Sequence, residues 1–314
     1  MVALDIGGTK LTVGLVDQEG RRLATQVRPT DQAASPARIV DALFAMAESA
    51  LAATALAWTD VAAVGVSYGG PLDYPAGRTV TCHHLPGWED VPLRELVARR
   101  AGRPAVVDND ANAAALGEAV FGAARGCAHV LHLNVGTGIG GGVVIGGRLH
   151  RGADSMAGEV GHTLVAPDGP LCTCGRRGCL EAVAAGPAIV RAAQEALRSG
   201  EPSCLATLPV DEITGRHVAE AAGQDALAAR VMQQAGKWIG LAIAAAVNLL
   251  NPHMVVIGGG VAGAGEALFA PLRAAVSSHA VPEATRRLRI VPGALGPWDA
   301  LLGAAALALQ EGIG

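Results

Sequence analysis

The sequence is poor in aromatic and in charged residues. Of its 314 residues, only 3% are Phe, Trp or Tyr and only 17% are Asp, Glu, Lys or Arg, whereas roughly 25% of residues are charged in soluble domains. Hydrophobic residues nevertheless make up 51% of the chain, which excludes intrinsic disorder. The core must therefore be filled by Leu, Val, Ile and Ala at short packing distances, as in a tightly packed α/β protein. A chain of this length favours two domains.

Positive charge is scarce as well. Lys and Arg together number 24, against 28 for Asp and Glu, so the net charge is −4. A surface that binds nucleic acid needs a basic patch that neutralises phosphates. We therefore expect no nucleic-acid partner.

The sequence lacks an uninterrupted apolar run long enough to cross a membrane. The segment between Lys237 and Glu266 carries no charged residue, but Asn248, Asn251 and residues 258–260 interrupt it. Because a bilayer span requires about 20 apolar residues, a buried helix followed by a buried strand fits better. The first residues show no signal-peptide pattern either. We expect a cytoplasmic protein without a membrane partner, whose six cysteines are thiols or metal ligands rather than disulfides.

Apolar strand-like runs alternate with longer helix-like segments along the chain. The expected strands cover residues 2–4, 11–16, 22–27, 61–67, 105–107, 130–135, 142–145 and 254–257. The expected helices cover residues 36–54, 92–102, 111–121, 187–199, 214–222, 225–250 and 298–310. This alternation predicts an α/β fold with mostly parallel sheets and helices on their faces.

A glycine loop between two strands occurs twice, at residues 5–10 and at residues 134–139. The repetition predicts a duplicated domain whose two loops face a cleft suited to a phosphate chain, since successive backbone N–H groups in such turns bind anions. Neither loop has the P-loop pattern. A third glycine run, residues 258–260, follows a buried strand, where an adenine or ribose could approach closely. The alternatives are chance similarity and ordinary tight turns.

Three cysteines and a histidine lie within an 18-residue segment rich in glycine. Three thiolates and one imidazole form a donor set that tetrahedral zinc prefers, and four protein ligands leave no open position, so the metal should be structural. The alternative is a set of buried free thiols beside an unrelated histidine. The four candidate ligands are His162, Cys172, Cys174 and Cys179. The remaining cysteines, Cys82, Cys127 and Cys204, do not cluster, and we expect them to be core thiols.

Carboxylates stand at two further places where a ligand could bind. Asp110 begins a predicted helix directly after a buried strand, where α/β folds bind ligands. It is either a helix cap or part of a site with its polar neighbours Asp108, Asn109 and Asn112. The second place lies beside the metal cluster, where the carboxylates at positions 159 and 181 would suit a polyhydroxyl ligand, although either could also be a solvated surface charge.

These motifs resemble those of the ROK family (repressors, open reading frames and kinases), whose kinases are sugar kinases of the actin-like ATPase superfamily. The matching segments follow the family's order and spacing over nearly the whole chain. They are DIGGTK at 5–10, NDAN at 109–112, GTGIGGG at 136–142, EVGH at 159–162, CTCGRRGCLE at 172–181 and IGGGV at 257–261. The cysteine signature is the most specific of them.

The resemblance implies two actin-like (ribonuclease H-like) domains around a central cleft, with a zinc-binding loop. Residues 1–109, joined by the C-terminal helix at about 298–314, would form the first domain. Residues 110–297 would form the second, with the zinc-binding insertion at about 152–186. The implied reaction is the transfer of phosphate from ATP, with Mg²⁺, to a hexose, most often at its 6-hydroxyl, and the implied zinc is structural.

The resemblance also implies roles for individual residues. Asp110 is the catalytic base, and His162 binds zinc through one ring nitrogen while the other faces a sugar hydroxyl. The implied sugar-binding residues are His84, Gly70, Asn109, Asp110, Glu159, His162 and Glu181. The implied nucleotide-binding residues are Gly7, Gly8, Thr9, Lys10, Gly136, Thr137, Gly138, Gly140 and Gly259, with Asp5 near the magnesium. The implied zinc ligands are His162, Cys172, Cys174 and Cys179.

One position departs from the pattern of many ROK glucokinases. Those proteins have Asn-Leu ahead of the tryptophan of this loop, whereas this sequence has His84 and Leu85 ahead of Trp88. An imidazole offers a different set of donors and acceptors from an amide. Glucose is the favoured substrate, and N-acetylhexosamines, fructose and other hexoses are the alternatives.

Two other functions compete with catalysis. ROK transcriptional repressors carry a helix-turn-helix segment before the first glycine loop, and only four residues precede Asp5 here. A sugar sensor that has lost ATP turnover is the second rival, and the intact Asp110 and both phosphate loops count against it. The family commonly forms dimers, so we expect a homodimer.

Overall fold

The computed structural model describes residues 1–81 and 85–311 and consists of two compact units. The first unit comprises Met1–Ala128, Gly142–Gly158 and Gly293–Gly314, and the second comprises His129–Gly141 and Glu159–Pro292. The resemblance implies a boundary after residue 109. That boundary stays a prediction; helix α3 (Asp110–Val120) belongs to the first compact unit, where it packs along α10 (Asp299–Glu311).

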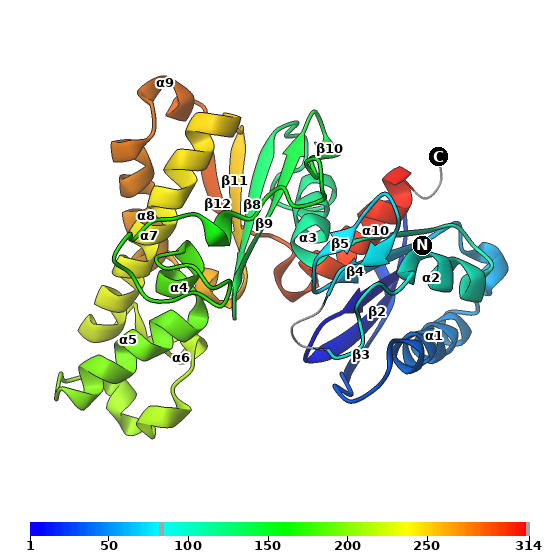
Figure 1. Ribbon diagram of the computed structural model, residues 1–314, viewed down its shortest axis with the longest axis horizontal. Coiled ribbons are helices and arrows are strands. Elements are labelled where there is room, and N and C mark those ends of the chain that lie inside the picture. Colours follow the sequence, from blue (N-terminus) through cyan, green and yellow to red (C-terminus); the bar gives the residue numbers. More distant parts are fainter. Residues whose placement is uncertain (82–84, 312–314) are drawn as a thin grey trace. The chain divides into compact units, whose positions relative to one another are not determined.

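A five-stranded sheet lies at the centre of the first unit (Figure 1). Its strands, in spatial order, are β3 (Arg22–Pro29), β2 (Lys10–Val16), β1 (Val2–Ile6), β4 (Val64–Tyr68) and β7 (Ala105–Asn109). β1, β4 and β7 are parallel, whereas β2 pairs antiparallel with both β1 and β3. Parallel neighbours need a crossover of about a dozen residues, and far shorter turns join β1, β2 and β3. The expectation of mostly parallel pairing is therefore wrong for this half of the sheet.

Helices cover both faces of this sheet. α1 (Pro36–Ala53) and α2 (Leu93–Ala101) pack on the face that carries Leu4 and Ile6, and α10 packs on the face that carries Ala3. Gly65 in β4 lies so close to α10 that a Cβ on it would come within 1.7 Å of the Ala304 carbonyl oxygen. The small residues of this sequence therefore allow close helix–sheet packing, as predicted.

A second five-stranded sheet repeats the strand order of the first. Its strands, in spatial order, are β10 (Arg148–Leu149), β9 (Ile139–Ile145), β8 (Val130–Val135), β11 (Met254–Gly258) and β12 (Arg289–Pro292). In each sheet the third strand in sequence lies at one edge, followed by the second, the first and then two parallel strands. The repeated order confirms the internal duplication that the glycine loops predict.

The helices of the second unit form a separate layer beside its strands (Figure 1). They are α4 (Leu180–Ala184), α5 (Gly186–Arg198), α6 (Gly215–Ala221), α7 (Ala226–Leu250), α8 (Glu266–His279) and α9 (Pro282–Thr285). α7 and α8 pack closely through Gly236 and Gly240, where a Cβ would lie 2.5 Å from a carbonyl oxygen of α8. The sequence predicts a helical stretch after residues 258–260 without bounds; α8 is that helix, and Pro271 interrupts its periodicity. None of the helices in the described part of the chain combines the length and apolarity that a bilayer span requires.

Short elements complete the fold. β5 (Leu72–Asp73) and β6 (Arg78–Thr79) form a small hairpin in the first unit. Short 3-10 turns cover Trp58–Asp60, Val160–His162, Cys204–Thr207, Val210–Glu212, Gly260–Ala264 and Gly296–Trp298. The expectation of core thiols is wrong for Cys204, which is exposed, while Cys127 is half-buried and Cys82 lies outside the described residues.

Candidate active site

The expected catalytic residue lies at the corner where β7 passes into α3. Asn109 is the N-cap of this helix: its Oδ1 accepts hydrogen bonds from the backbone N–H groups of Ala111 at 2.9 Å and Asn112 at 3.4 Å. The capping role that Asp110 could have had therefore belongs to Asn109. Asp110 is the first helical residue and is half-buried, and its Oδ1 accepts from the Ala111 N–H at 2.8 Å.

Two glycines of the loop after β4 contact this corner. A Cβ on Gly69 would lie 3.7 Å from Oδ2 of Asp110, so no side chain covers the carboxylate from this direction. The Gly70 carbonyl oxygen accepts a hydrogen bond from Nδ2 of Asn109 at 3.2 Å, and a Cβ on Gly70 would lie 2.6 Å from the Thr81 carbonyl oxygen. Gly70 thus orients Asn109, while its predicted contact with a sugar stays a prediction.

The parallel strands bring a second carboxylate to the same end of the sheet. Asp5 in β1 pairs with Ser67 in β4, and the Ser67 hydroxyl donates to Oδ1 of Asp5 at 3.0 Å. Burial raises the pKa of Asp5 to about 7; the negative charge of Asp110 adds to this rise, and Lys10 opposes it. A cation relieves the repulsion between two carboxylates, and carboxylate oxygens together with phosphates are what Mg²⁺ binds. The residues present therefore fit the predicted magnesium site.

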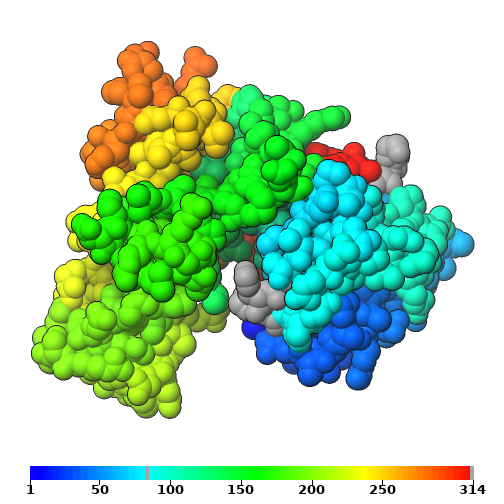
Figure 2. Space-filling model, in the orientation of Figure 1, coloured from blue at the N-terminus to red at the C-terminus, as the bar shows by residue number. Residues whose placement is uncertain are grey.

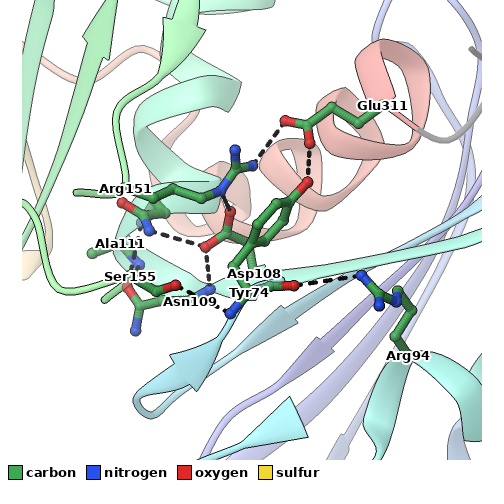
Figure 3. Close-up of polar contacts among 9 residues, drawn as sticks. Tyr74, Arg94, Asp108, Asn109, Ala111, Arg151, Ser155 and Glu311 are labelled. Carbon is green, nitrogen blue, oxygen red and sulfur yellow. Dashed lines mark hydrogen bonds and ion pairs between the residues drawn. The ribbon is translucent and has the colours of Figure 1, made fainter. Parts of the chain in front are cut away.

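Two other polar residues of this corner are structural. Asp108 and Asn112 are buried, with 2% and 3% of their surface exposed. Oδ1 of Asp108 accepts from Nδ2 of Asn112 at 2.9 Å and from the Asn109 N–H at 2.8 Å, and its Oδ2 accepts from Nε of Arg151 at 2.7 Å (Figure 3). They hold the corner in place rather than binding a ligand. Arg151 was not among the residues that the sequence singled out.

The first predicted phosphate loop, residues 7–9, is the tight turn between β1 and β2. The Gly7 carbonyl oxygen accepts from Oγ1 of Thr30 at 2.7 Å, and the Gly8 carbonyl oxygen accepts from Nε2 of Gln32 at 2.8 Å. The segment after β3 thus holds the carbonyl side of the turn. The shape of this turn is therefore fixed before any ligand binds.

The second glycine loop lines a pocket of about 390 Å³ in the second unit. Gly136 and Thr137, after β8, line it together with Gly260 and Val261, after β11, and the nucleotide site expected at these loops stays a prediction. The remaining lining residues are Gly186, Pro187, Val190, Ile213, Thr214, Gly215 and Arg216. The sequence did not single these out, because no motif links the starts of α5 and α6 to a glycine loop that lies far earlier in the chain. A volume of this size is within the range of small-molecule sites.

Three predicted nucleotide-binding glycines of the second unit do not line this pocket. A Cβ on Gly138 would lie 2.6 Å from Oε2 of Glu181, and Gly140 lies within β9. Gly259 has φ +84°, and a Cβ on it would come within 2.2 Å of the Val135 carbonyl oxygen. Gly259 is therefore required by the turn itself, because no other residue fits the close approach to β8.

The four predicted zinc ligands converge in the second unit. Their donor atoms all lie within 4.8 Å of one another; the Sγ atoms of Cys174 and Cys179 are 3.6 Å apart, and Sγ of Cys172 lies 3.7 Å from Nδ1 of His162. Ligands at about 2.3 Å from a tetrahedral zinc would be separated by about 3.8 Å. The donor set and its spacing therefore fit zinc. This segment, green in Figure 2, lies on the surface of the second unit.

Positive φ angles shape the zinc loop. Gly175 has φ +83° and Gly178 has φ +72°, and a Cβ on Gly178 would come within 1.7 Å of the Ala166 carbonyl oxygen. Glycine at these positions allows the backbone to curl around the metal site, as the sequence predicts.

Glu181 connects the zinc loop to the second glycine loop. Its Oε2 accepts from the Ile139 N–H at 3.0 Å, and its Oε1 accepts from Oγ1 of Thr173 at 3.1 Å. On the other side of the cluster, Oε2 of Glu159 lies 3.9 Å from Nε2 of His162, and half of the Glu159 side chain is exposed. The sugar contacts predicted for these residues stay predictions. His84, the remaining predicted sugar contact, lies outside the described residues.

The chain is similar to known proteins over its whole length. Residues 1–311 match the model of the ROK family. A glucokinase from Thermotoga maritima is 36% identical over 321 residues, which cover 100% of this chain and 98% of that protein.

Two solved structures have the same fold. The crystal structure of a ROK family glucokinase from Streptomyces griseus in complex with glucose and AMPPNP is 38% identical, covers 99% of both chains and has a TM-score of 0.84. A ROK family transcriptional regulator, a homologue of the Escherichia coli MLC protein, is 28% identical with a TM-score of 0.89 and covers 100% of this chain and 79% of the regulator. The α/β fold is thus that of the actin-like ROK sugar kinases, and the chain belongs to the ROK family.

Proposed function

We propose that this protein phosphorylates a hexose with ATP, with glucose as the favoured substrate, the 6-hydroxyl as the acceptor and Asp110 as the general base. The observation that carries the proposal is the corner at the end of β7. Because Asn109 caps α3, Asp110 stands half-buried at the carboxyl end of the parallel strands, where α/β sheets bind ligands. The Streptomyces griseus glucokinase, 38% identical to this chain, was solved with glucose and AMPPNP, which supports both substrate classes.

The residues at the corner account for the proton transfer. In the reaction, the sugar oxygen forms a bond to the γ-phosphorus, the bond from that phosphorus to the bridging oxygen breaks, and ADP leaves. The hydroxyl proton passes to the carboxylate of Asp110. The position of Asp110 in the first turn of α3 favours the ionised form, which can accept this proton. A general base contributes about 10² to 10⁴-fold to such a step.

The pocket beside the second glycine loop is the proposed nucleotide site. Val190, Ile213 and Val261 offer apolar contacts to a base, and Arg216 offers a guanidinium that can stack on it. Mg²⁺ bound with ATP would neutralise charge on the phosphates, and Asp5 is the proposed carboxylate nearest to it. Asp5 fits this task because burial, together with the nearby negative charge of Asp110, raises its pKa, and a bound cation would offset both effects.

The zinc loop is the proposed sugar-binding segment. With Nδ1 of His162 directed at Cys172, its Nε2 is on the side of Glu159. A metal on Nδ1 would fix the tautomer of the ring, so that Nε2 carries a proton and donates to a sugar hydroxyl. Glu159 and Glu181 would accept hydrogen bonds from neighbouring hydroxyls.

The test is a coupled ADP-release assay with ATP, Mg²⁺ and a panel of glucose, N-acetylglucosamine, N-acetylmannosamine, mannose, fructose and allose. We expect turnover with glucose that Asp110→Asn reduces at least about 100-fold, with the thermal midpoint and hexose affinity preserved. Asp41→Asn, an exposed carboxylate on α1, is the matched control. An Asp110→Asn variant with more than a tenth of the wild-type kcat would remove the general-base role.

A sugar-responsive regulator is the second candidate, because the regulator structure matches this fold with a TM-score of 0.89. The two functions differ in an observable way. A regulator would bind the sugar without consuming ATP and would bind DNA, whereas the kinase releases ADP in proportion to the sugar phosphorylated. The net charge of −4 favours the kinase.

We also propose that the protein forms a homodimer. Leu249 is 84% exposed and Val281 is 50% exposed, and both lie in the second unit, where neighbouring apolar side chains could supply a symmetric interface. Light scattering on the purified protein tests this, and a monomer at micromolar concentration would contradict it.

A further inference from the structure

Arg151 lies at the centre of a polar network in the first unit that neither the sequence motifs nor the proposed reaction accounts for (Figure 3). Its Nε donates to Asp108 at 2.7 Å, and its second terminal nitrogen donates to Oε1 of Glu311 at 2.8 Å. Its guanidinium also lies 3.5 Å from the centre of the Tyr74 ring. Only 15% of the side chain is exposed. One side chain from the segment after β10 therefore connects β7, the β5–β6 hairpin and the end of α10.

Asp108 links Arg151 to the corner formed by Asn109 and Asp110. The same carboxylate that binds Arg151 through Oδ2 accepts, through Oδ1, the backbone N–H of Asn109 and Nδ2 of Asn112. Asn109 in turn caps α3 and binds the Gly70 carbonyl oxygen. Asp108 thus helps to fix the backbone path from β7 into Asp110, through its hydrogen bonds with Asn109 and Asn112.

Burial makes the ionisation of Asp108 costly without a partner. Asp108 is 2% exposed, and this burial keeps its pKa above the ordinary value, although the guanidinium of Arg151 and the hydrogen bonds from Asn112 and Asn109 lower it. The other titratable groups around it are Tyr74 and Glu311, and burial together with the hydrogen bond to Glu311 raises the pKa of Tyr74 to about 12. Tyr74 is therefore neutral at physiological pH, and Arg151 is the cation of this network.

We propose that Arg151 is a positioning residue for catalysis, which keeps Asp108 ionised and thereby holds the Asn109–Asp110 corner in the geometry that phosphoryl transfer requires. The proposal rests on the proposed function. A displacement of about 1 Å in a reacting group costs about 100-fold in rate, so loss of this clamp should act on turnover. Arg151 carries no proposed substrate contact, so the KM values should change little.

The second contact of Arg151 extends the network to the C-terminal helix. Glu311 in α10 accepts from Arg151 with one oxygen and from the Tyr74 hydroxyl with the other, and the Tyr74 N–H donates to Oγ of Ser155 at 3.1 Å. Lys at position 151 would keep the positive charge but could not make both contacts and stack on the ring. The charge and the geometry can therefore be separated by mutation.

The test is steady-state kinetics from pH 6 to pH 9 on the full-length protein, with five forms: wild type, Arg151→Met, Arg151→Lys, Asp108→Asn/Arg151→Met, and the control Arg148→Met. Arg148 is exposed and lies in β10, three residues before Arg151. For Arg151→Met we expect kcat at pH 7 to fall at least about tenfold, with KM for ATP and hexose within about threefold of wild type. Loss of the Arg151 charge raises the pKa of Asp108 further, so kcat should recover as the pH rises.

The other variants identify the titrating group. Arg151→Lys keeps the charge and should retain the wild-type pH profile with an intermediate kcat. The double variant has no carboxyl at position 108, so the alkaline recovery should vanish. A kcat for Arg151→Met equal to that of Arg148→Met, or the same recovery in the double variant, would overturn the proposal while leaving the kinase activity of the wild type in place.

If the wild type phosphorylates no sugar in the panel, the proposed function fails. The interaction between Arg151 and Asp108 is then tested through the stability of the protein alone. Arg151→Met should lower the midpoint of denaturant unfolding more in the wild-type background than in the Asp108→Asn background. Only in the wild-type background does it leave a buried carboxylate without a cation. Equal falls in the two backgrounds would refute the clamp.

Discussion

His132 should make the second unit sensitive to mild acid. This residue lies in β8 opposite Val256 of β11, it is 0% exposed, and neither ring nitrogen has a hydrogen-bond partner among the described residues. Burial lowers the pKa of His132 from 6.5 to about 4. In the unfolded chain the ring is half-protonated at pH 6.5, whereas in the folded unit it is still neutral at this pH. Stability is therefore complete above pH 6.5 and is lost as the pH falls toward 4.

The size of this effect follows from the two pKa values of His132. At about 1.36 kcal/mol for each pKa unit, the full loss amounts to about 3.4 kcal/mol below pH 4, and about 2 kcal/mol is already lost at pH 5. Carboxylates also change the stability of the protein in this range. The quantity to measure is thus the difference between wild type and His132→Leu, a variant of similar volume that cannot take up a proton.

The assay is urea unfolding at pH 7.5, 6.5, 5.5 and 5.0, followed through the transition of the second unit, together with an NMR titration of the imidazole protons. The free energy of unfolding of wild type relative to His132→Leu should be constant above pH 7 and fall by about 2 kcal/mol by pH 5. The NMR signal of His132, identified by its absence from His132→Leu, should not shift with pH above pH 5. A ring that titrates near pH 6.5, or a difference independent of pH, would refute the reasoning.

Three further perturbations test the zinc loop, the core and the nucleotide pocket. Removal of the metal by a chelator should weaken hexose binding, measured by calorimetry, more than nucleotide binding, because it releases the loop around His162; equal losses would indicate general unfolding instead. Gly65→Ala should lower the free energy of unfolding by about 3 kcal/mol or more, since its Cβ would overlap the Ala304 carbonyl oxygen, whereas Gly223→Ala, in open space, should change it by less than about 0.5 kcal/mol. Arg216→Ala should raise KM for ATP about tenfold without changing KM for hexose, if the guanidinium stacks on the base; an unchanged KM for ATP would exclude that contact.

The sequence predicts those parts of the fold that local chemistry determines. Buried strands of β-branched residues, helices that begin at Pro36 or Pro92, and the glycine turns after β1 and β8 are all found within a few residues of their expected places. The zinc cluster is predictable for the same reason, because three ligands lie within eight residues and glycines with positive φ connect them. In each case the residues that form the feature are close together in the sequence.

Other features depend on contacts between distant segments. The pair of Asp108 and Arg151 joins residues 43 positions apart, and nothing near Arg151 distinguishes it from an exposed arginine such as Arg148. The place of Arg216 in the pocket beside the second glycine loop likewise depends on how α6 packs there. The cap of α3 is a local feature, and the sequence leaves open whether Asp110 is that cap or part of a ligand site. The cap is Asn109 instead; Asn and Asp cap helices equally well, and the two residues are adjacent here.

The comparison structures show why the activity must be argued from side chains. A transcriptional regulator matches this fold with a TM-score of 0.89 and a glucokinase with 0.84, so the fold is compatible with both functions. A kinase needs, in addition, a base held within hydrogen-bond reach of the acceptor hydroxyl. In this chain two features fix the backbone on the strand side of Asp110: Asn109 caps α3, and Asp108 forms a charge pair with Arg151. Buried charge pairs cost free energy unless both partners are well hydrogen-bonded, and in this chain both Asp108 and Arg151 are. The kinetics of the Arg151 variants therefore distinguish a pair that serves turnover from one that serves only the fold.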